Sequence, residues 1–192
     1  MINSATPIYL ASKSPRRRKL LKQLNISFKS FSVKMDERVK SKEKPSDAVL
    51  RLSKEKLELA KVKIKNGIII TADTIVVLDN LILGKPKNKK DAFRILMMLS
   101  GRTHIVYTGY SIFNSATGHT ISEYEKTKVT FRNLNNEEIL GYIEGGSPMD
   151  KAGAYGIQDD FGAVFIKKIN GCYYNVVGLP LAKFYHALLR IF

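Results

Sequence analysis

Two hydroxyl and two guanidinium side chains lie within the six residues Ser12-Lys13-Ser14-Pro15-Arg16-Arg17. An apolar run that ends at Ala11 precedes them and predicts a buried strand, and leucines at helical spacing follow them. Ser14 suits the N-cap of that helix and Pro15 its first position, so a helix N-terminus is expected here. Such an end attracts anions, and arginine forks match phosphate oxygens. The spacing indicates a phosphate-binding corner, although a Ser-Pro helix start beside arginine also occurs in helices that bind no ligand.

Two carboxylates could add metal or proton chemistry to this corner. Asp73 follows the continuous apolar run Ile68–Ala72, and we expect it to end a buried strand, where open α/β sheets place their ligand crevice. A carboxylate there can hold a divalent metal or accept a proton from water. Glu37 follows another predicted strand and could be a second ligand of a Mg²⁺ that bridges phosphates. The structural alternatives are a turn cap for Asp73 and a solvated loop charge for Glu37.

Two lysines and a glycine-containing segment complete the candidate set. Lys85 stands between Gly84 and Pro86, so a rigid turn should fix its position. Lys56 falls in the middle of a predicted helix, where an exposed lysine is the ordinary case in such a lysine-rich chain. The segment Asp150–Gln158 contains two glycines, which let backbone approach a ligand closely or form a flexible surface loop.

Several common chemistries lack their motifs in this chain. There is no Walker-type phosphate loop and no serine nucleophile elbow, and the three histidines are too far apart for zinc spacing. The single cysteine, Cys172, allows no internal disulfide and suits a reducing compartment. No apolar run approaches the roughly 20 residues that span a membrane, and the N-terminus does not resemble a signal peptide. We therefore expect a cytoplasmic protein without a membrane partner.

The formal net charge of +15 over 192 residues has two interpretations. A basic field can attract nucleic acid or concentrate a polyanionic substrate. Alternatively, the lysines reflect composition and lie on solvated faces. They are dispersed along the chain and form no patch interleaved with aromatic residues, so we favour a small anionic substrate over nucleic acid.

The secondary-structure pattern predicts a single α/β domain, residues 1–192, that can form two lobes. Helices and strands are interspersed without strict alternation, which favours a mixed sheet over a purely parallel one. We expect strands over 8–11, 28–33, 68–72, 75–83 (or a hairpin about Asp79-Asn80), 105–113 and 122–131, and a hairpin of two strands, 161–169 and 173–177, around Asn170-Gly171. We expect helices after Pro15, over 47–65 with Ser46 as its cap, over 88–100, from Asn135 or Asn136 to Gly145, and over 180–192.

Taken together and in this order, the motifs resemble those of the Maf family of nucleoside triphosphate pyrophosphatases over nearly the whole chain. Each motif alone is weak, and the ordered set is specific. The resemblance rests on Leu10–Arg17, Asp36-Glu37, Arg51-Leu52 with Glu55-Lys56, Ala72–Thr74, Gly84–Pro86, Leu99–Gly101, Asp150–Gln158 and Val177–Pro180.

The resemblance implies an α/β fold with a mixed, curved central sheet, flanking helices and two lobes around a deep cleft, of the Maf/ITPase type. It also implies a homodimer that hydrolyses a nucleoside triphosphate to the monophosphate and pyrophosphate with a divalent metal, Mg²⁺ or Mn²⁺. Asp73 would accept a proton from the water that attacks the α-phosphorus, and Glu37 and Asp73 would lie at the metal. Phosphate binding is implied for Ser12, Arg16, Lys56 and Lys85.

The resemblance also implies a choice of base. Arg17, Thr74 and Gln158 match the branch of the family that acts on dTTP and UTP, with modified pyrimidine triphosphates as further possible substrates. An amide can both donate and accept, as the edge of uracil or thymine requires. The branch resembling 7-methyl-GTP pyrophosphatases carries an aromatic residue in place of Arg17 and glutamate in place of Gln158. A second alternative is a regulator of cell division that binds nucleotides or nucleic acid without turnover.

Overall fold

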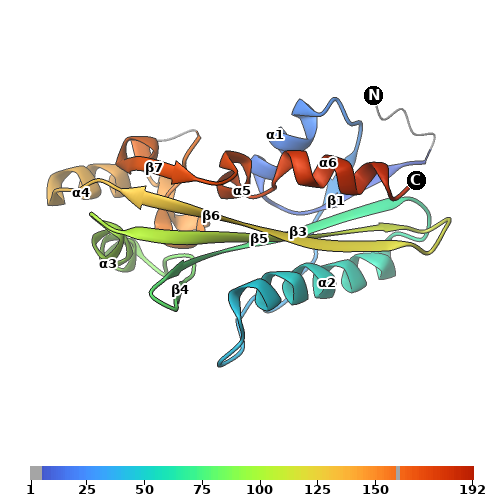
Figure 1. Cartoon of the computed structure of the whole chain (residues 1–192), viewed down its shortest axis with the longest axis horizontal. Helices are drawn as coiled ribbons and strands as arrows, with labels where there is room; N and C mark the ends of the chain where they lie inside the picture. Colours follow the sequence, from blue (N-terminus) through green and yellow to red (C-terminus); the bar gives the residue numbers. More distant parts are fainter. Residues whose placement is uncertain (1–5, 159–160) are drawn as a thin grey trace. The chain divides into compact units, whose positions relative to one another are not determined.

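The computed structural model describes residues 6–158 and 161–192, whose strands form one mixed sheet in the order β2-β1-β3-β5-β6-β7, with β4 paired to β3 (Figure 1). The strands are β1 Ile8–Ala11, β2 Lys29–Phe31, β3 Ile68–Leu78, β4 Leu81–Leu83, β5 Thr103–Asn114, β6 Thr120–Phe131 and β7 Ile166–Asn170. The helices are α1 Pro15–Gln23, α2 Pro45–Lys63, α3 Lys89–Leu99, α4 Asn136–Glu144, α5 Tyr173–Val177 and α6 Leu181–Leu189. β1 is parallel to β2 and β3, whereas β3–β4 and β6–β7 are antiparallel. The prediction of a mixed sheet with flanking helices is confirmed.

The chain divides into two compact units. Unit 1 comprises the described residues up to Asp73, together with Thr108–Glu125 and Gly178–Phe192. Unit 2 comprises the described residues within Thr74–Tyr107 and Lys126–Val177. The long strands β3, β5 and β6 contribute residues to both units.

In unit 1, helices cover both faces of the sheet. Figure 1 shows α2 along one face and α1 and α6 on the other. Because both faces are covered, Ile68, Ile69 and Ile70 of β3 are all fully buried, which explains their continuous apolar run. The α2 backbone comes so close to β5 that a Cβ at Gly109 would lie 2.4 Å from the Val49 carbonyl oxygen. Glycine at this position therefore sets how closely the helix packs on the strand.

The starts of α1 and α2 in unit 1 follow from their prolines. Ser14 Oγ accepts a hydrogen bond from the Arg17 amide at 3.4 Å and Pro15 opens α1, as predicted. The prediction that Ser46 caps α2 is wrong. That helix begins at Pro45, with Lys44 as an N-cap that makes no side-chain hydrogen bond. The fixed φ and missing amide of proline suit the first helical position, so Pro45 draws the start two residues earlier than predicted.

Unit 2 contains α3, α4 and α5 with the hairpin and the ends of the long strands. Its core includes Leu96 of α3, Ile139 of α4 and Phe131 of β6, all buried. The hairpin between β3 and β4 turns at Asp79-Asn80, as predicted, and both residues have positive φ, 46° and 68°. Two central residues with positive φ are typical of the type I′ turn, which matches the twist of the flanking strands.

The prediction of a second hairpin in this unit is wrong. Residues Tyr173–Val177 form the short helix α5, and β7 begins only at Ile166, after a 3₁₀ helix over Phe161–Phe165. Tyr173 and Tyr174 are both exposed, whereas a strand with one buried face would bury one of two neighbours. The buried Asn175 amide fixes the helix by donating to Val106 O and Thr127 Oγ1, each at 3.0 Å.

His104 at the start of β5 gives unit 2 an acid-sensitive core. The ring is buried, its Nε2 bonds the Tyr155 hydroxyl at 2.8 Å, and its Nδ1 has no hydrogen-bond partner. Burial lowers the pKa of His104 to about 4. As the pH falls below 6.5, His104 is therefore protonated in the unfolded chain before it is protonated in the folded protein. Stability present above pH 6.5 should therefore decline by up to about 3 kcal/mol as the pH falls to 4. Denaturant unfolding of wild type and H104Q across this range should show a weaker pH dependence in H104Q, and equal slopes would contradict the assignment.

Candidate active site

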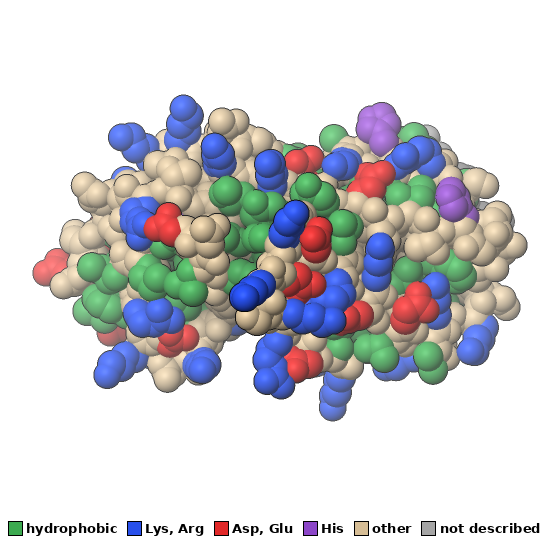
Figure 2. Space-filling model, turned by 60° about the horizontal axis from the view of Figure 1, so that its bottom comes forward, with side chains coloured by type: hydrophobic (Ala, Val, Ile, Leu, Met, Phe, Trp, Pro, Cys, Tyr) green, Lys and Arg blue, Asp and Glu red, His purple; other side chains and the backbone are tan. Residues whose placement is uncertain are grey.

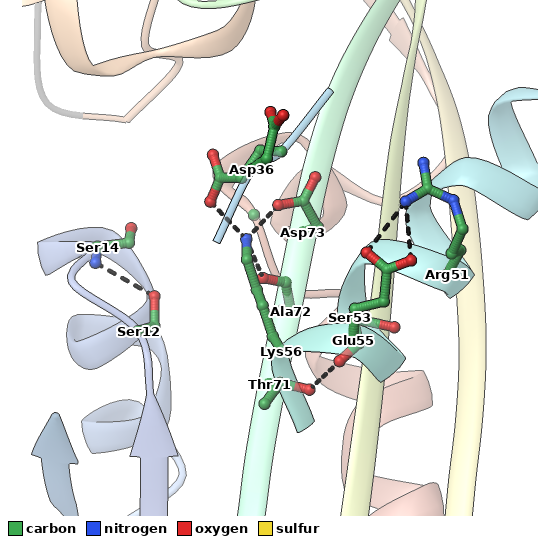
Figure 3. Close-up of polar contacts among 12 residues, drawn as sticks. Ser12, Ser14, Asp36, Arg51, Ser53, Glu55, Lys56, Thr71, Ala72 and Asp73 are labelled. Atoms are coloured by element: carbon green, nitrogen blue, oxygen red, sulfur yellow. Dashed lines mark hydrogen bonds and ion pairs between the residues drawn. The ribbon is translucent and has the colours of Figure 1, made fainter. Parts of the chain in front are cut away.

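A buried lysine of α2 joins two carboxylates in unit 1. Lys56 Nζ contacts Asp73 Oδ1 of β3 (Figure 3). It also lies 2.7 Å from Glu37 Oε1, which comes from the loop after β2. The side chains of Lys56 and Asp73 are each 8% exposed, whereas that of Glu37 is 42% exposed. Lys56 is therefore a buried lysine, and the alternative that it is an ordinary exposed lysine of a helix is wrong. A buried charge of this kind is tolerated only with close partners, and here it has two.

A row of buried hydroxyl groups fixes α2 against β3 next to this lysine. Thr71 Oγ1 donates to the Ser53 carbonyl at 2.7 Å, as Figure 3 shows, and Ser53 Oγ lies 3.0 Å from Ser111 Oγ on β5. Ser53 is one helical turn before Lys56, and Thr71 is two residues before Asp73 on the same face of β3. These bonds set the register that brings Lys56 to Asp73.

Asp73 does not end its strand, contrary to the prediction. β3 continues without a break to Leu78, so the carboxylate lies in the middle of an eleven-residue strand. Ile75, Val76 and Val77 are strong strand formers, and Lys56 offsets the charge that would otherwise oppose burial. Asp73 is the last residue of β3 that belongs to unit 1, and Thr74 is the first that belongs to unit 2.

The predicted corner at the start of α1 has the expected local geometry. Ser12 Oγ accepts from the Ser14 amide at 3.2 Å (Figure 3), and Ser14 caps the helix. Arg16, on the first turn, is half-buried. The nine-residue helix thus begins with its amide groups and both serines in one turn, an arrangement suited to phosphate.

Arg17 connects this corner to the strand that carries Asp73. Its Nε donates to the Gly178 carbonyl at 2.8 Å and its Nη1 to the Ala72 carbonyl at 3.0 Å. Burial lowers the pKa of Arg17, and the negative charges of Asp73 and Glu37 oppose that shift. The contact with Gly178 spans 161 residues, so no local sequence signal could have predicted it. Arg17 is thus a structural tie as well as a candidate for substrate binding.

The remaining predicted site residues belong to unit 2. Lys85 is exposed in the turn after β4, and that turn is joined to the glycine-containing segment because the Gly153 amide donates to Gly84 O at 3.1 Å. Gly153 has φ +72° and packs on Val76, where a Cβ would meet the valine methyls at 3.0 Å. The Gln158 Oε1 atom is buried and accepts no hydrogen bond, although the residue makes other polar contact.

Asp73 and Glu37 are the two carboxylates at this position that could hold a metal. Within residues 6–158 and 161–192, no group of three or more histidine, cysteine or acidic side chains could bind an ion. Because both carboxylates contact one ammonium group, their oxygens lie close together. Mg²⁺ is commonly bound by one or two carboxylates with substrate phosphates as further ligands, so this donor set fits such an ion.

On the face of the molecule drawn in Figure 2, the positive charge is dispersed. Figure 2 shows Lys and Arg side chains spread over the face drawn, with acidic side chains among them. This agrees with the interpretation that the lysines lie on solvated faces. No helix in the described part of the chain combines the length and apolar character that a membrane span requires.

Comparison with known proteins agrees with the resemblance in the motifs. The family model described as Maf-like protein matches residues 7–191, and the chain therefore belongs to the Maf family. A protein of Carboxydothermus hydrogenoformans named dTTP/UTP pyrophosphatase is 48% identical over 181 residues, which cover 94% of this chain and 96% of the relative. One of Chlorobium phaeovibrioides with the same name is 43% identical over 189 residues, covering 96% and 97%.

A solved structure supports the fold. A HAM1 protein from Coxiella burnetii matches with a TM-score of 0.51 over 96% of this chain and 99% of that chain. The two sequences are 10% identical, so the likeness concerns the fold alone. The predicted family and fold class are thus confirmed, whereas the curvature of the sheet and the cleft remain predictions.

Proposed function

We propose that this protein is a nucleoside triphosphate pyrophosphatase that hydrolyses dTTP and UTP to the monophosphate and pyrophosphate. The observation that carries the proposal is the buried Lys56 ammonium shared by Asp73 and Glu37. Arg17 ties the start of α1 to the strand that carries Asp73, so an anion-attracting helix end belongs to the same unit. The relatives' shared name, with nearly complete coverage of both chains, supports the same activity.

Asp73 is the proton acceptor in this proposal. As the water oxygen bonds to the α-phosphorus, its proton passes to the Asp73 carboxylate, and the bond from that phosphorus to the α,β-bridging oxygen breaks. The electron pair leaves with pyrophosphate. Phosphoryl transfer depends on positioning and on the stabilisation of spread negative charge rather than on covalent catalysis. The cations and hydroxyls proposed to bind the phosphates are Lys56, Lys85, Arg16 and Ser12.

Asp73 and Glu37 would hold the divalent metal, Mg²⁺ or Mn²⁺. When bound, such an ion neutralises phosphate charge and favours ionisation of the attacking water. Lys56 keeps both carboxylates close together and offsets their mutual repulsion in the ligand-free protein.

We further propose that Arg17, Thr74 and Gln158 select the pyrimidine base. The Gln158 amide can accept from N3–H of uracil or thymine and donate to the neighbouring carbonyl, and its Oε1 atom is buried. A wrong base would leave buried polar groups without partners, which is how such sites discriminate.

Exchanging the Gln158 amide for a carboxylate should therefore weaken the preference for pyrimidines. An ionised carboxylate accepts but cannot donate to the base carbonyl, so Q158E should lower the ratio of kcat/KM for UTP over GTP by about 10-fold or more. The same change at the exposed Gln23 of α1, Q23E, serves as a charge-matched control. An unchanged ratio in Q158E would argue against this role.

Pyrophosphate release with Mg²⁺ or Mn²⁺ across dTTP, UTP, CTP, GTP, 7-methyl-GTP and ITP tests the proposed function directly. We expect dTTP and UTP to be hydrolysed fastest. Preference for 7-methyl-GTP would retain the chemistry but refute the base assignment. Absence of turnover, together with salt-dependent affinity for duplex DNA, would favour the binding regulator.

The proposal also covers the domain organisation, the oligomeric state and the location of the enzyme. We propose one domain over residues 1–192 with two lobes, a homodimer in solution and a cytoplasmic location. The single cysteine, Cys172, is a free thiol, as a reducing compartment allows. Light scattering at several protein concentrations measures the oligomeric state.

A further inference from the structure

The loop that carries Glu37 is clamped onto α2 by one arginine. Arg51 Nε and Nη2 donate to the two carboxylate oxygens of Glu43 at 2.7 and 2.8 Å. Nη2 also donates to the Arg38 carbonyl at 3.1 Å, so the guanidinium holds the loop at two points. Glu43 in turn accepts from the Lys40 amide at 3.0 Å, which fixes the turn between the two points.

The clamp has the features of a strong ion pair. The Arg51 and Glu43 side chains are 19% and 13% exposed, and their bonding is bidentate. On the other side, Nη1 of Arg51 lies 3.1 Å from both carboxylate oxygens of Glu55, one helical turn away, which holds the guanidinium in place (Figure 3). The hydrogen bonds from Arg51 lower the pKa of Glu43 to about 2, so the pair stays charged throughout the neutral range. Planar pairs of this kind fix geometry as well as contributing energy.

The clamp acts on the backbone directly beside Glu37. Arg38, whose carbonyl is held, is the next residue, and Glu37 belongs to a stretch without helix or strand. Lys56 and Arg51 project from the same helix, so α2 holds the side chain of Glu37 through one residue and the backbone after it through the other. Because the loop is held at the side chain of Glu37 and at the backbone after it, the Glu37 carboxylate stays near Asp73.

We infer that Arg51, through its bonds to Glu43 and to the Arg38 carbonyl, is a positioning residue that presents Glu37 to a divalent cation. The inference rests on the proposed function, because it assigns the metal to Glu37 and Asp73. Two residues of the motif Arg51-Leu52 with Glu55-Lys56 thus have different roles. Lys56 contacts the two carboxylates, and Arg51 holds the loop that carries Glu37.

Binding of Mn²⁺ alone, followed by the electron paramagnetic resonance signal of the free ion, tests this inference without turnover. We expect R51Q to bind Mn²⁺ about 10-fold more weakly than wild type, since outer residues that orient metal ligands have effects of this size. R132Q is a matched control, because Arg132 forms a similar bidentate pair with Glu138 in unit 2, at 3.0 and 2.5 Å. Its Mn²⁺ affinity should equal that of wild type.

A double-mutant cycle shows whether Arg51 acts through Glu37. If it does, R51Q/E37Q should bind Mn²⁺ no more weakly than E37Q, whereas independent effects would multiply. Amide hydrogen exchange should also quicken over residues 36–44 in R51Q and not in R132Q. E43Q, which removes the bidentate acceptor and leaves Arg51 and Glu55 in place, should show a smaller effect in the same direction and serves if R51Q does not fold.

The outcomes separate this inference from the proposed function. Equal Mn²⁺ affinity of wild type and R51Q, multiplicative effects in the cycle, or no Mn²⁺ binding by wild type would overturn the inference. Pyrophosphate release by wild type is measured separately. If wild type binds Mn²⁺ through this clamp but hydrolyses no nucleotide, the proposed function fails and the positioning role stands.

Discussion

Replacing Asp73 with asparagine is expected to lower kcat for dTTP by about 10³-fold while leaving the protein folded. The amide has nearly the same shape but cannot accept the proton of the attacking water, and general-base catalysis contributes 10²–10⁴-fold in enzymes. Lys56 keeps Glu37 as a partner at 2.7 Å, so its buried ammonium is not left alone. Pyrophosphate release at saturating nucleotide, with the melting temperature measured in parallel, tests the prediction.

The D91N variant is a suitable control for this experiment. Asp91 lies in α3 of unit 2, forms an ion pair with Arg94 at 2.7 Å and has no part in the proposed mechanism, so the change removes a paired carboxylate without touching a proposed site residue. D91N should retain wild-type kcat. A D73N variant with more than about one tenth of wild-type kcat would show that another group accepts the proton.

Local signals in the sequence located most helix and strand ends. Ser14 caps α1 as predicted, and Asn88 caps the helix predicted over 88–100. Asn135, one of the two predicted starts of α4, forms a full capping box with Glu138. These predictions work because a cap satisfies amide groups within its own first turn, so the necessary information is contained in a few neighbouring residues. The sheet at the centre of the fold followed equally well from its apolar runs.

Two of the errors arose where distant residues decide the structure. Asn175 draws Tyr173–Val177 into a helix through bonds to Val106 and Thr127, which are 69 and 48 residues away. Asp73 can remain inside a strand because α2 supplies a buried counterion. Local strand propensity carries no information about these distant partners. The sequence pattern alone therefore predicted a strand over 173–177 and a strand end at Asp73.

In the candidate site, too, some features could be predicted from the sequence and others depend on residues far apart in it. The family motifs named Asp73, Lys56 and Glu37, but the residue types and their spacing left an exposed lysine as the default for Lys56. Its burial depends on how α2 packs on β3, which the hydroxyl bonds from Ser53 to Thr71 and Ser111 determine. Arg51 was part of a motif without a role, because its contacts with the loop become visible only in three dimensions.

Replacing Lys56 with methionine should have opposite effects on turnover and on metal binding. Methionine preserves much of the length and packing of the side chain but removes the ammonium that contacts Asp73 and Glu37. We expect kcat for dTTP to fall about 10²-fold or more, because a preorganised cation no longer stabilises the charge that develops on the phosphates. The two carboxylates then lack their shared counterion, so K56M should bind Mn²⁺ more tightly than wild type.

This pair of results distinguishes a catalytic lysine from a purely structural one. If Lys56 only maintained the fold, its loss would disorder the site, and Mn²⁺ affinity would fall together with kcat. The repulsion between Asp73 and Glu37 should also lower the melting temperature of K56M without metal, and added Mn²⁺ should raise it more than in wild type. K61M, which removes a lysine paired with Glu58 at 2.8 Å on the same helix, should show none of these changes. Weaker Mn²⁺ binding by K56M would refute the arrangement of charges on which the proposed mechanism depends.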